Sequence, residues 1–218
     1  MHIERFAVTF ALWLVPFSAL AAAERPSFDL TLESWVGPAR FGAQSFKSGS
    51  GCGGNLCTQE MLNGTLATGG VSLVARSGRY AFGILFDGSG KFDTVDTTDA
   101  HLGALGGVAH DPVRWLRLEA LGEIGAHEVI DIGLAGIAAS GDTHVWLPYA
   151  GIRPGITLRL GVVGPLRFVT GFWAFARFDL AHRDAVVSFY QRSLPDGSAQ
   201  YHVGGWNLGF AYRLGFEL

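Results

Sequence analysis

The sequence predicts an all-β fold, specifically a closed antiparallel transmembrane β-barrel of about eight strands. Long segments alternate apolar and polar residues with a period of two, which is typical of strands that have two different faces. Charged residues make up 16% of the 218 residues and hydrophobic residues 49%, whereas soluble domains have roughly 25% charged residues. Short and long connections also alternate along the chain, as they do in membrane barrels.

The first 23 residues predict a secretory signal peptide. Arg5 precedes an uncharged run from Phe6 to Ala23, and the small residues 21–23 form an A-x-A cleavage site before Glu24. An uncleaved anchor helix is the alternative, because about 18 apolar residues can just span a bilayer. Pro16 and the small residues favour cleavage. Residues 24–218 are then expected to form one exported domain.

The first predicted strand covers residues 28–36, where apolar Phe28, Leu30 and Leu32 alternate with polar residues. Three weaker strands follow at about 64–76, 79–87 and 100–109. Glycine-rich sequence makes the parity of 64–76 and 100–109 ambiguous, whereas residues 79–87 carry large apolar side chains at even positions. These segments account for the first half of the barrel.

Four clearer strands complete the count, at residues 115–126, 145–162, 168–180 and 206–218. In the last of them every even position from Trp206 to Leu218 is apolar or aromatic, and the odd positions are small, polar or charged. The odd face is predicted to point into the barrel and to form a charge network of Glu33, Arg117, Glu119, Glu123, Arg153, Arg159, Arg177, Asp179, Arg213 and Glu217. The even face is predicted to meet lipid and includes Trp146, Ile156, Leu158, Phe172, Trp206, Phe210 and Phe216.

The connections support closure of the sheet. Short turns are expected at residues 77–78, 111–112 and 164–165, and long polar or glycine-rich loops at about 38–63, 88–99, 127–143 and 181–199. A sheet in hydrocarbon cannot leave edge N–H and C=O groups unpaired, so the last strand must pair with the first. A soluble lipocalin-like barrel is the alternative. Its apolar face would point inward, and its exterior would need more charges than this chain supplies.

This pattern resembles the small eight-stranded outer-membrane barrels typified by the OmpA transmembrane domain, OmpX and OmpW. The resemblance covers nearly the whole chain after residue 23 and rests on pattern, not on a diagnostic motif. It implies the outer membrane of a Gram-negative bacterium, contact with outer-membrane lipids, and a barrel-assembly machinery that reads the final strand. That class commonly ends in an aromatic residue, whereas this chain ends in Leu218 with Phe216 at the same parity.

The inward charges are nearly balanced in sign, and buried charges need partners. Because eight strands enclose a bore just wide enough for side chains to fill, we expect a salt-bridged, side-chain-filled lumen. A conducting, porin-like pore and a pocket for a hydrophobic ligand are the alternatives. Inward Tyr149, Trp173, Phe175 and Tyr201 would narrow the bore further.

No catalytic residues are assigned. His182, Asp184 and Ser188 share one predicted loop and offer the residue types of a hydrolytic triad, so a lipid-modifying enzyme is a further alternative. His101, near Asp99, and His144 are expected at the rim of the barrel. Their types and spacing are also common in solvated loops, so the sequence favours a protein that is not an enzyme.

No cofactor or metal site is predicted either. Cys52 and Cys57 are five positions apart and are expected to form one loop disulfide in an exported chain. The acidic segment from Asp87 to Asp99 could attract a divalent cation, but its spacing does not match an EF-hand loop. The glycines of residues 49–54 lack the βαβ context of a dinucleotide site.

The net charge of −3 offers no basic surface for nucleic acid. The function expected from the sequence is therefore structural or surface-interacting. An extracellular ligand would bind at the long loops, because a rigid scaffold positions them for recognition.

Overall fold

The computed structural model describes residues 28–48, 59–90, 98–130, 138–141, 143, 144–163, 165–190 and 197–218. The predicted signal peptide, Cys52 and Cys57 lie outside the described residues. The described residues form strands and turns. None of them belongs to a helix long and apolar enough to cross a membrane.

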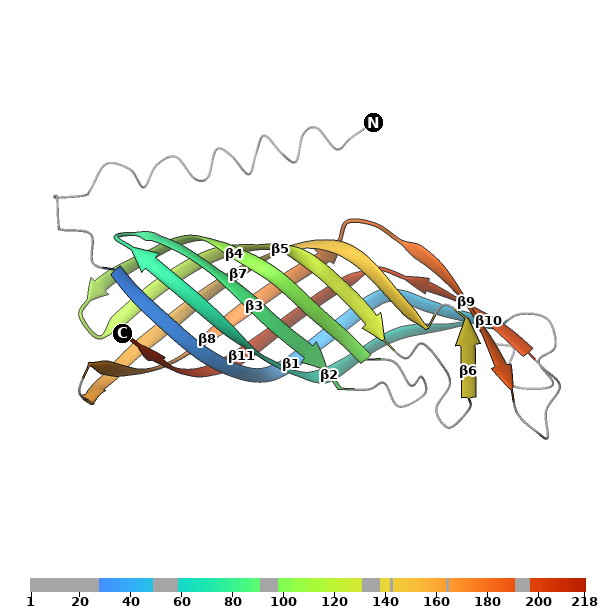
Figure 1. Cartoon of the computed structure of the whole chain (residues 1–218), viewed down its shortest axis with the longest axis horizontal. Helices are drawn as coiled ribbons and strands as arrows, with labels where there is room; N and C mark the ends of the chain where they lie inside the picture. The colour runs from blue at the N-terminus through green and yellow to red at the C-terminus, as the bar shows by residue number, and fades with distance from the viewer. Residues whose placement is uncertain are drawn as a thin grey trace, which may run out of the picture.

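Eight strands form a closed antiparallel barrel, as predicted (Figure 1). They are β1 (Phe28–Ser48), β2 (Gln59–Ser77), β3 (Tyr80–Ser89), β4 (Thr98–Val113), β5 (Leu116–Ile130), β7 (His144–Val163), β8 (Leu166–Asp179) and β11 (Trp206–Glu217). Each pairs with its neighbours along the chain, and β1 pairs with β11 from Thr31↔Glu217 to Gly42↔Trp206. This seam closes the sheet, so no barrel strand leaves an unpaired edge in the wall.

The two ends of the barrel differ. Tight turns join β2 to β3 at residues 78–79 and β4 to β5 at 114–115, and β1 starts and β11 ends at this same turn end (Figure 1). The second turn lies three residues beyond the predicted one at Asp111 and Pro112, because β4 continues to Val113 across an irregularity in its pairing with β5. The opposite end, here called the loop end, carries the longer connections.

Much of the sequence predicted as loop is in fact strand. The short strands β6 (Ala138–Gly141), β9 (Arg183–Tyr190) and β10 (Gly197–Val203) lie beyond the rim at the loop end (Figure 1). β10 pairs with the far end of β1 through residues 45–48, β9 pairs with β10, and β6 pairs with β9. We call these three strands the loop-end sheet. It forms because β1 is 21 residues long and offers an edge beyond the barrel wall.

The two faces of the wall are opposite in character. Large apolar side chains on the outside are widely exposed, for example Phe172 at 62% and Phe210 at 69%. Glu123, Arg153 and Arg213 on the inside are almost completely buried. The strands therefore place their apolar face outward, which is opposite to the arrangement in a soluble lipocalin-like barrel.

Candidate functional site in the lumen

All ten residues of the predicted charge network line the lumen, and none of their side chains is more than 7% exposed. The period of two carries them to one face, and closure of the barrel brings that face together. They do not form a single network. They fall into three groups along the bore, described here from the turn end to the loop end.

The first group closes the turn end. Arg117 binds Asp29 at 2.8 Å, Asp111 at 2.9 Å and Glu217 at 2.6 Å. Arg159 binds Asp111 at 2.6 Å and Glu217 at 3.0 Å. These guanidinium groups therefore connect β5 and β7 to carboxylates on β1, β4 and β11, across the mouth of the bore.

The second group lies deeper and centres on Glu119. Arg213 binds Glu119 and also Glu33, the latter at 3.0 Å. Arg76 donates to Glu119 at 2.8 Å through Nε and at 2.5 Å through Nη2. The Thr157 hydroxyl donates to the second Glu119 oxygen at 2.8 Å. Two cations and two anions thus neutralise one another where water is excluded, as buried charges require.

The third group joins Glu123 to two arginines. Arg177 binds Glu123 at 2.7 Å, and its two terminal nitrogens donate hydrogen bonds to the Asp87 carboxylate at 3.0 and 2.7 Å. Arg153 binds the other Glu123 oxygen through Nε. Bidentate guanidinium–carboxylate pairs fix geometry as well as charge, so Asp87 and Arg177 hold β3 to β8 through the lumen.

A histidine pair extends this group toward the loop end. The two ring nitrogens of His127 lie 2.9 Å from Asp179 and 3.0 Å from Asp99. A doubly protonated imidazole ring donates through both nitrogens, and this arrangement lets it bind two carboxylates at once. His101 lies 3.1 Å from Asp87. His101, expected at the rim, and its neighbour Asp99 are both buried.

Five charged lumen residues besides those histidines are absent from the predicted network: Asp29, Arg76, Asp87, Asp99 and Asp111. Glycines obscure the parity of β2 and β4, the segment from Asp87 to Asp99 has the composition of an acidic loop, and Asp111 precedes a proline that predicts a turn. The register places two of them: Asp87 pairs with His101, and Asp99 pairs with Val129, whose side chain is buried in the lumen. Asp93 and Asp96 lie outside the described residues.

An apolar layer fills the bore beside the charges. Trp35, Phe41, Trp173, Phe175 and Tyr201 are buried in one cluster with aliphatic residues of the barrel and the loop-end sheet. Burial raises the pKa of the Tyr201 hydroxyl on β10, so the phenol stays neutral in this layer.

Arg153 enters the apolar layer between two indoles. Its guanidinium carbon lies 4.0 Å from the Trp173 ring and 5.5 Å from the Trp35 ring. Such cation–π contacts are favourable when water is excluded. The two terminal nitrogens of Arg153 and both indole N–H groups find no acceptor among the described residues.

The predicted lipid-facing residues lie on the outside of the wall. Trp146, Ile156, Phe172, Phe210 and Phe216 are 49% to 69% exposed. Leu158 and Trp206 are only partly exposed. The indole of Trp206 packs over Gly42 of the adjacent strand, where a Cβ would lie 2.3 Å from the ring.

The loop residues considered for catalysis are not assembled. His182 Nδ1 donates to the Gly204 carbonyl at 3.2 Å, and Asp184 binds His202 at 2.9 Å. Ser188 is four positions after Asp184 on β9, which corresponds to about 13 Å in an extended strand. His144 binds Glu128 at 3.3 Å. Among the described residues no cluster of three or more histidines, cysteines or carboxylates is suited to a metal ion.

The closed antiparallel wall, with an apolar exterior and a charged interior, indicates a membrane environment. Exposing this exterior to water would be unfavourable, and a sheet in hydrocarbon must close so that its edge N–H and C=O groups are paired. The protein is an outer-membrane β-barrel. Its loop end is accordingly the extracellular end, since the longer loops of these barrels face outward.

No protein-family model matches the chain, and no curated protein matches it significantly. Among solved structures it is similar to the outer membrane protein OprG from Pseudomonas aeruginosa, with 10% identity, 87% of this chain and 97% of that chain covered, and a TM-score of 0.48. Neisserial surface protein A gives 11% identity, 86% and 98% coverage, and a TM-score of 0.46. The attachment invasion locus protein of Yersinia pestis gives 12% identity, 84% coverage of this chain, 97% coverage of that chain, and a TM-score of 0.35. These values are too low to transfer a ligand, partner or activity to this chain.

Proposed function

We propose that this barrel is a closed, non-enzymatic scaffold whose task is carried out at the loop-end sheet, as a structural or surface-interaction protein. The observation that carries the proposal is the filled bore. Ion pairs bridge it at three levels, and an apolar layer with Trp35 and Trp173 fills the space toward the extracellular end. A bore occupied in this way supports the extracellular structure but leaves little room for solute.

The loop-end sheet is the part best placed to meet a partner. β10 continues the wall through its pairing with β1, and the side chains of Ala185, Val187 and Val203 pack into the apolar layer of the barrel. Recognition surfaces commonly sit on segments that a rigid scaffold positions. We propose an extracellular ligand there, outer-membrane lipids around the wall, and the barrel-assembly machinery as a partner during biogenesis.

Single-channel recording tests the closed lumen. The refolded wild-type barrel is expected to show no steady conductance in planar bilayers, and Trp173→Ala, which removes the indole beside Arg153, is expected to show some. Insertion of both proteins is checked by heat-modifiable gel mobility. Steady conductance of the wild type would contradict the proposal.

Replacement of residues 183–203 by a short glycine-serine turn tests the extracellular role. The shortened barrel should still migrate as a folded form, because β8 and β11 pair along their whole length without the hairpin. In a strain that lacks the protein, the wild type should restore any cell-surface property that the deletion alters, and the shortened barrel should not. Full restoration by the shortened barrel would contradict a role for the loop-end sheet.

A small pore is the second candidate, and one observation favours it. The terminal nitrogens of Arg153 and the indole N–H groups beside them are buried without an acceptor, and water commonly satisfies such groups. Conductance of the wild type that changes in Arg153→Met would support this candidate over the scaffold.

A further inference from the structure

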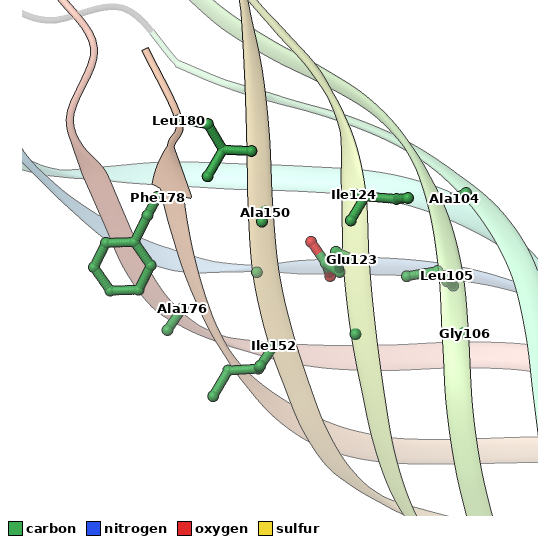
Figure 2. Close-up of a pocket in the computed structure, with 12 residues that line it drawn as sticks. Ala104, Leu105, Gly106, Glu123, Ile124, Ala150, Ile152, Ala176, Phe178 and Leu180 are labelled. Atoms are coloured by element: carbon green, nitrogen blue, oxygen red, sulfur yellow. The ribbon is translucent and has the colours of Figure 1, made fainter. Parts of the chain in front are cut away.

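We propose that an acyl chain of an anionic lipid occupies an apolar groove on the outer wall of β4, β5, β7 and β8, with its headgroup near His182 and Arg183. The groove has a volume of about 650 Å³. That is within the roughly 300–1,000 Å³ of small-molecule sites. Figure 2 shows Ile124 of β5, Phe178 of β8 and Leu180, which directly follows β8, beside the groove.

The groove exists because outward positions on four adjacent strands lack large side chains. Gly106, Gly122, Ala150 and Ala176 lie at such positions, whereas elsewhere the wall carries leucine, isoleucine and phenylalanine. A Cβ at Gly106 would meet nothing within 4 Å, and a Cβ at Gly122 would come no closer than 3.5 Å to another atom. The missing volume is therefore open space on the lipid side.

The groove is a depression in the wall and not a portal through it. Below it, β4 pairs with β5 without interruption from Thr98↔Ile130 to His110↔Leu118, and β5 pairs with β7 from Leu116↔Leu158 to Ile130↔His144. Glu123 borders the groove, but its carboxylate binds Arg153 and Arg177 inside the lumen. An occupant thus stays in the hydrocarbon layer.

Hydrocarbon chains are the molecules that surround this wall, and their shape and polarity fit the lining. Apart from Glu123, whose carboxylate faces the lumen, the groove is lined by glycine, alanine, leucine, isoleucine and phenylalanine. An unfilled groove would leave the atoms of Ile124, Ile152 and Phe178 without dispersion partners on one side. A chain that fills it gains those contacts.

The extracellular end of the groove adds a preference for a negative headgroup. Leu180 lies at that end, and His182 and Arg183 follow it within three residues. Arg183 is exposed and makes no ion pair with another described residue, and the ring of His182 stacks on His202 at 5.1 Å. Asp184 is already bound to His202. Basic groups near a membrane surface attract anionic lipids.

Photo-crosslinking tests the acyl-chain site. The full-length barrel is reconstituted into vesicles of phosphatidylglycerol that carries a diazirine on one acyl chain, and labelled peptides are identified after irradiation. Wild type should be labelled at residues 104–106, 122–124 and 176–180. Gly106→Leu with Gly122→Leu fills the groove and should lose this labelling. Ala120→Leu adds a leucine side chain on the same face of β5 outside the groove and should keep it.

Equal labelling of the wild type and the filled variant would overturn the proposal. So would a wild-type dimer that the filled variant abolishes, because a second copy would then be the occupant. The headgroup is tested with zwitterionic phosphatidylcholine bearing the same diazirine. Groove labelling should fall, and Arg183→Gln should reduce labelling only with phosphatidylglycerol. Equal labelling by both lipids would overturn the headgroup preference.

Discussion

The imidazole ring of His101 stacks on that of His127, with centroids 4.4 Å apart and planes at 8°. The two residues are cross-strand partners on β4 and β5. Through Asp87 and Asp179 they also reach β3 and β8. One histidine pair therefore connects four strands on different sides of the bore, close to the extracellular end.

Replacement of His127 by leucine should destabilise the barrel strongly. The change keeps a side chain of similar volume but leaves the buried carboxyl groups of Asp99 and Asp179 without their histidine partner, and loss of one partner of a buried ion pair costs about 3 to 5 kcal/mol. His144→Leu is the matched control, since its ring is 54% exposed and makes one bond to Glu128. Equilibrium unfolding from lipid vesicles measures both. Equal losses would show that the His127 bonds are not formed.

Replacing a buried and an exposed arginine at the turn end should likewise lower the free energy of unfolding by different amounts. Arg117 is buried and binds three carboxylates, whereas the Arg167 side chain is 42% exposed and pairs with Glu217 alone among the described residues, at 3.2 Å. Arg117→Met should lower the free energy of unfolding by several kcal/mol. Arg167→Met should lower it by no more than about 1 kcal/mol. A larger effect of Arg167→Met in the same unfolding assay would contradict the assigned pairing.

The face assignment predicts a depth-dependent cost for charge on the outer wall. Phe172 lies at the centre of β8 and is 62% exposed, and Phe28 opens β1 at the turn end and is 68% exposed. Phe172→Arg should cost about 2 to 4 kcal/mol, and Phe28→Arg no more than about 1 kcal/mol. Refolding into bilayers of fixed thickness gives both values. If Phe172→Arg were neutral, that face of β8 would not meet lipid.

Closure of the seam should depend on Gly37. A Cβ at this position of β1 would lie 1.8 Å from the Phe210 carbonyl oxygen of β11. Gly37→Ala should therefore prevent normal pairing of the two strands, and the heat-modifiable folded band should be lost or weakened. Gly106→Ala adds the same methyl group where nothing lies within 4 Å and should fold normally. Normal folding of Gly37→Ala would require a wider seam.

The sequence predicts the wall of the barrel well because each strand by itself alternates between apolar residues for the lipid and polar residues for the lumen. Glu119 and Leu118 differ in polarity whatever their partners are, so parity alone places them. Pairs across the bore are different, since Glu33 and Arg213 are 180 positions apart. Only closure determines which of ten buried charges meet, and His127 enters that set because two carboxylates from other strands enclose it.

The loop-end sheet was beyond prediction for a related reason. β9 and β10 are eight and seven residues long, and their polar neighbours read as loop. They are ordered by an edge that β1 provides more than 130 residues earlier in the chain. Tertiary pairing of this kind overrides the local composition on which sequence interpretation rests.

The pairing of β1 with β11 also determines when the barrel can close during folding. Both flanks of β1 must find partners, β2 at once and β11 only after the intervening strands have emerged. A chain released or stalled before β11 would expose two open strand edges and an apolar exterior together, the combination that favours aggregation. The barrel can therefore close only after β11 has been synthesised, and two remote strands share responsibility for the last edge of the wall.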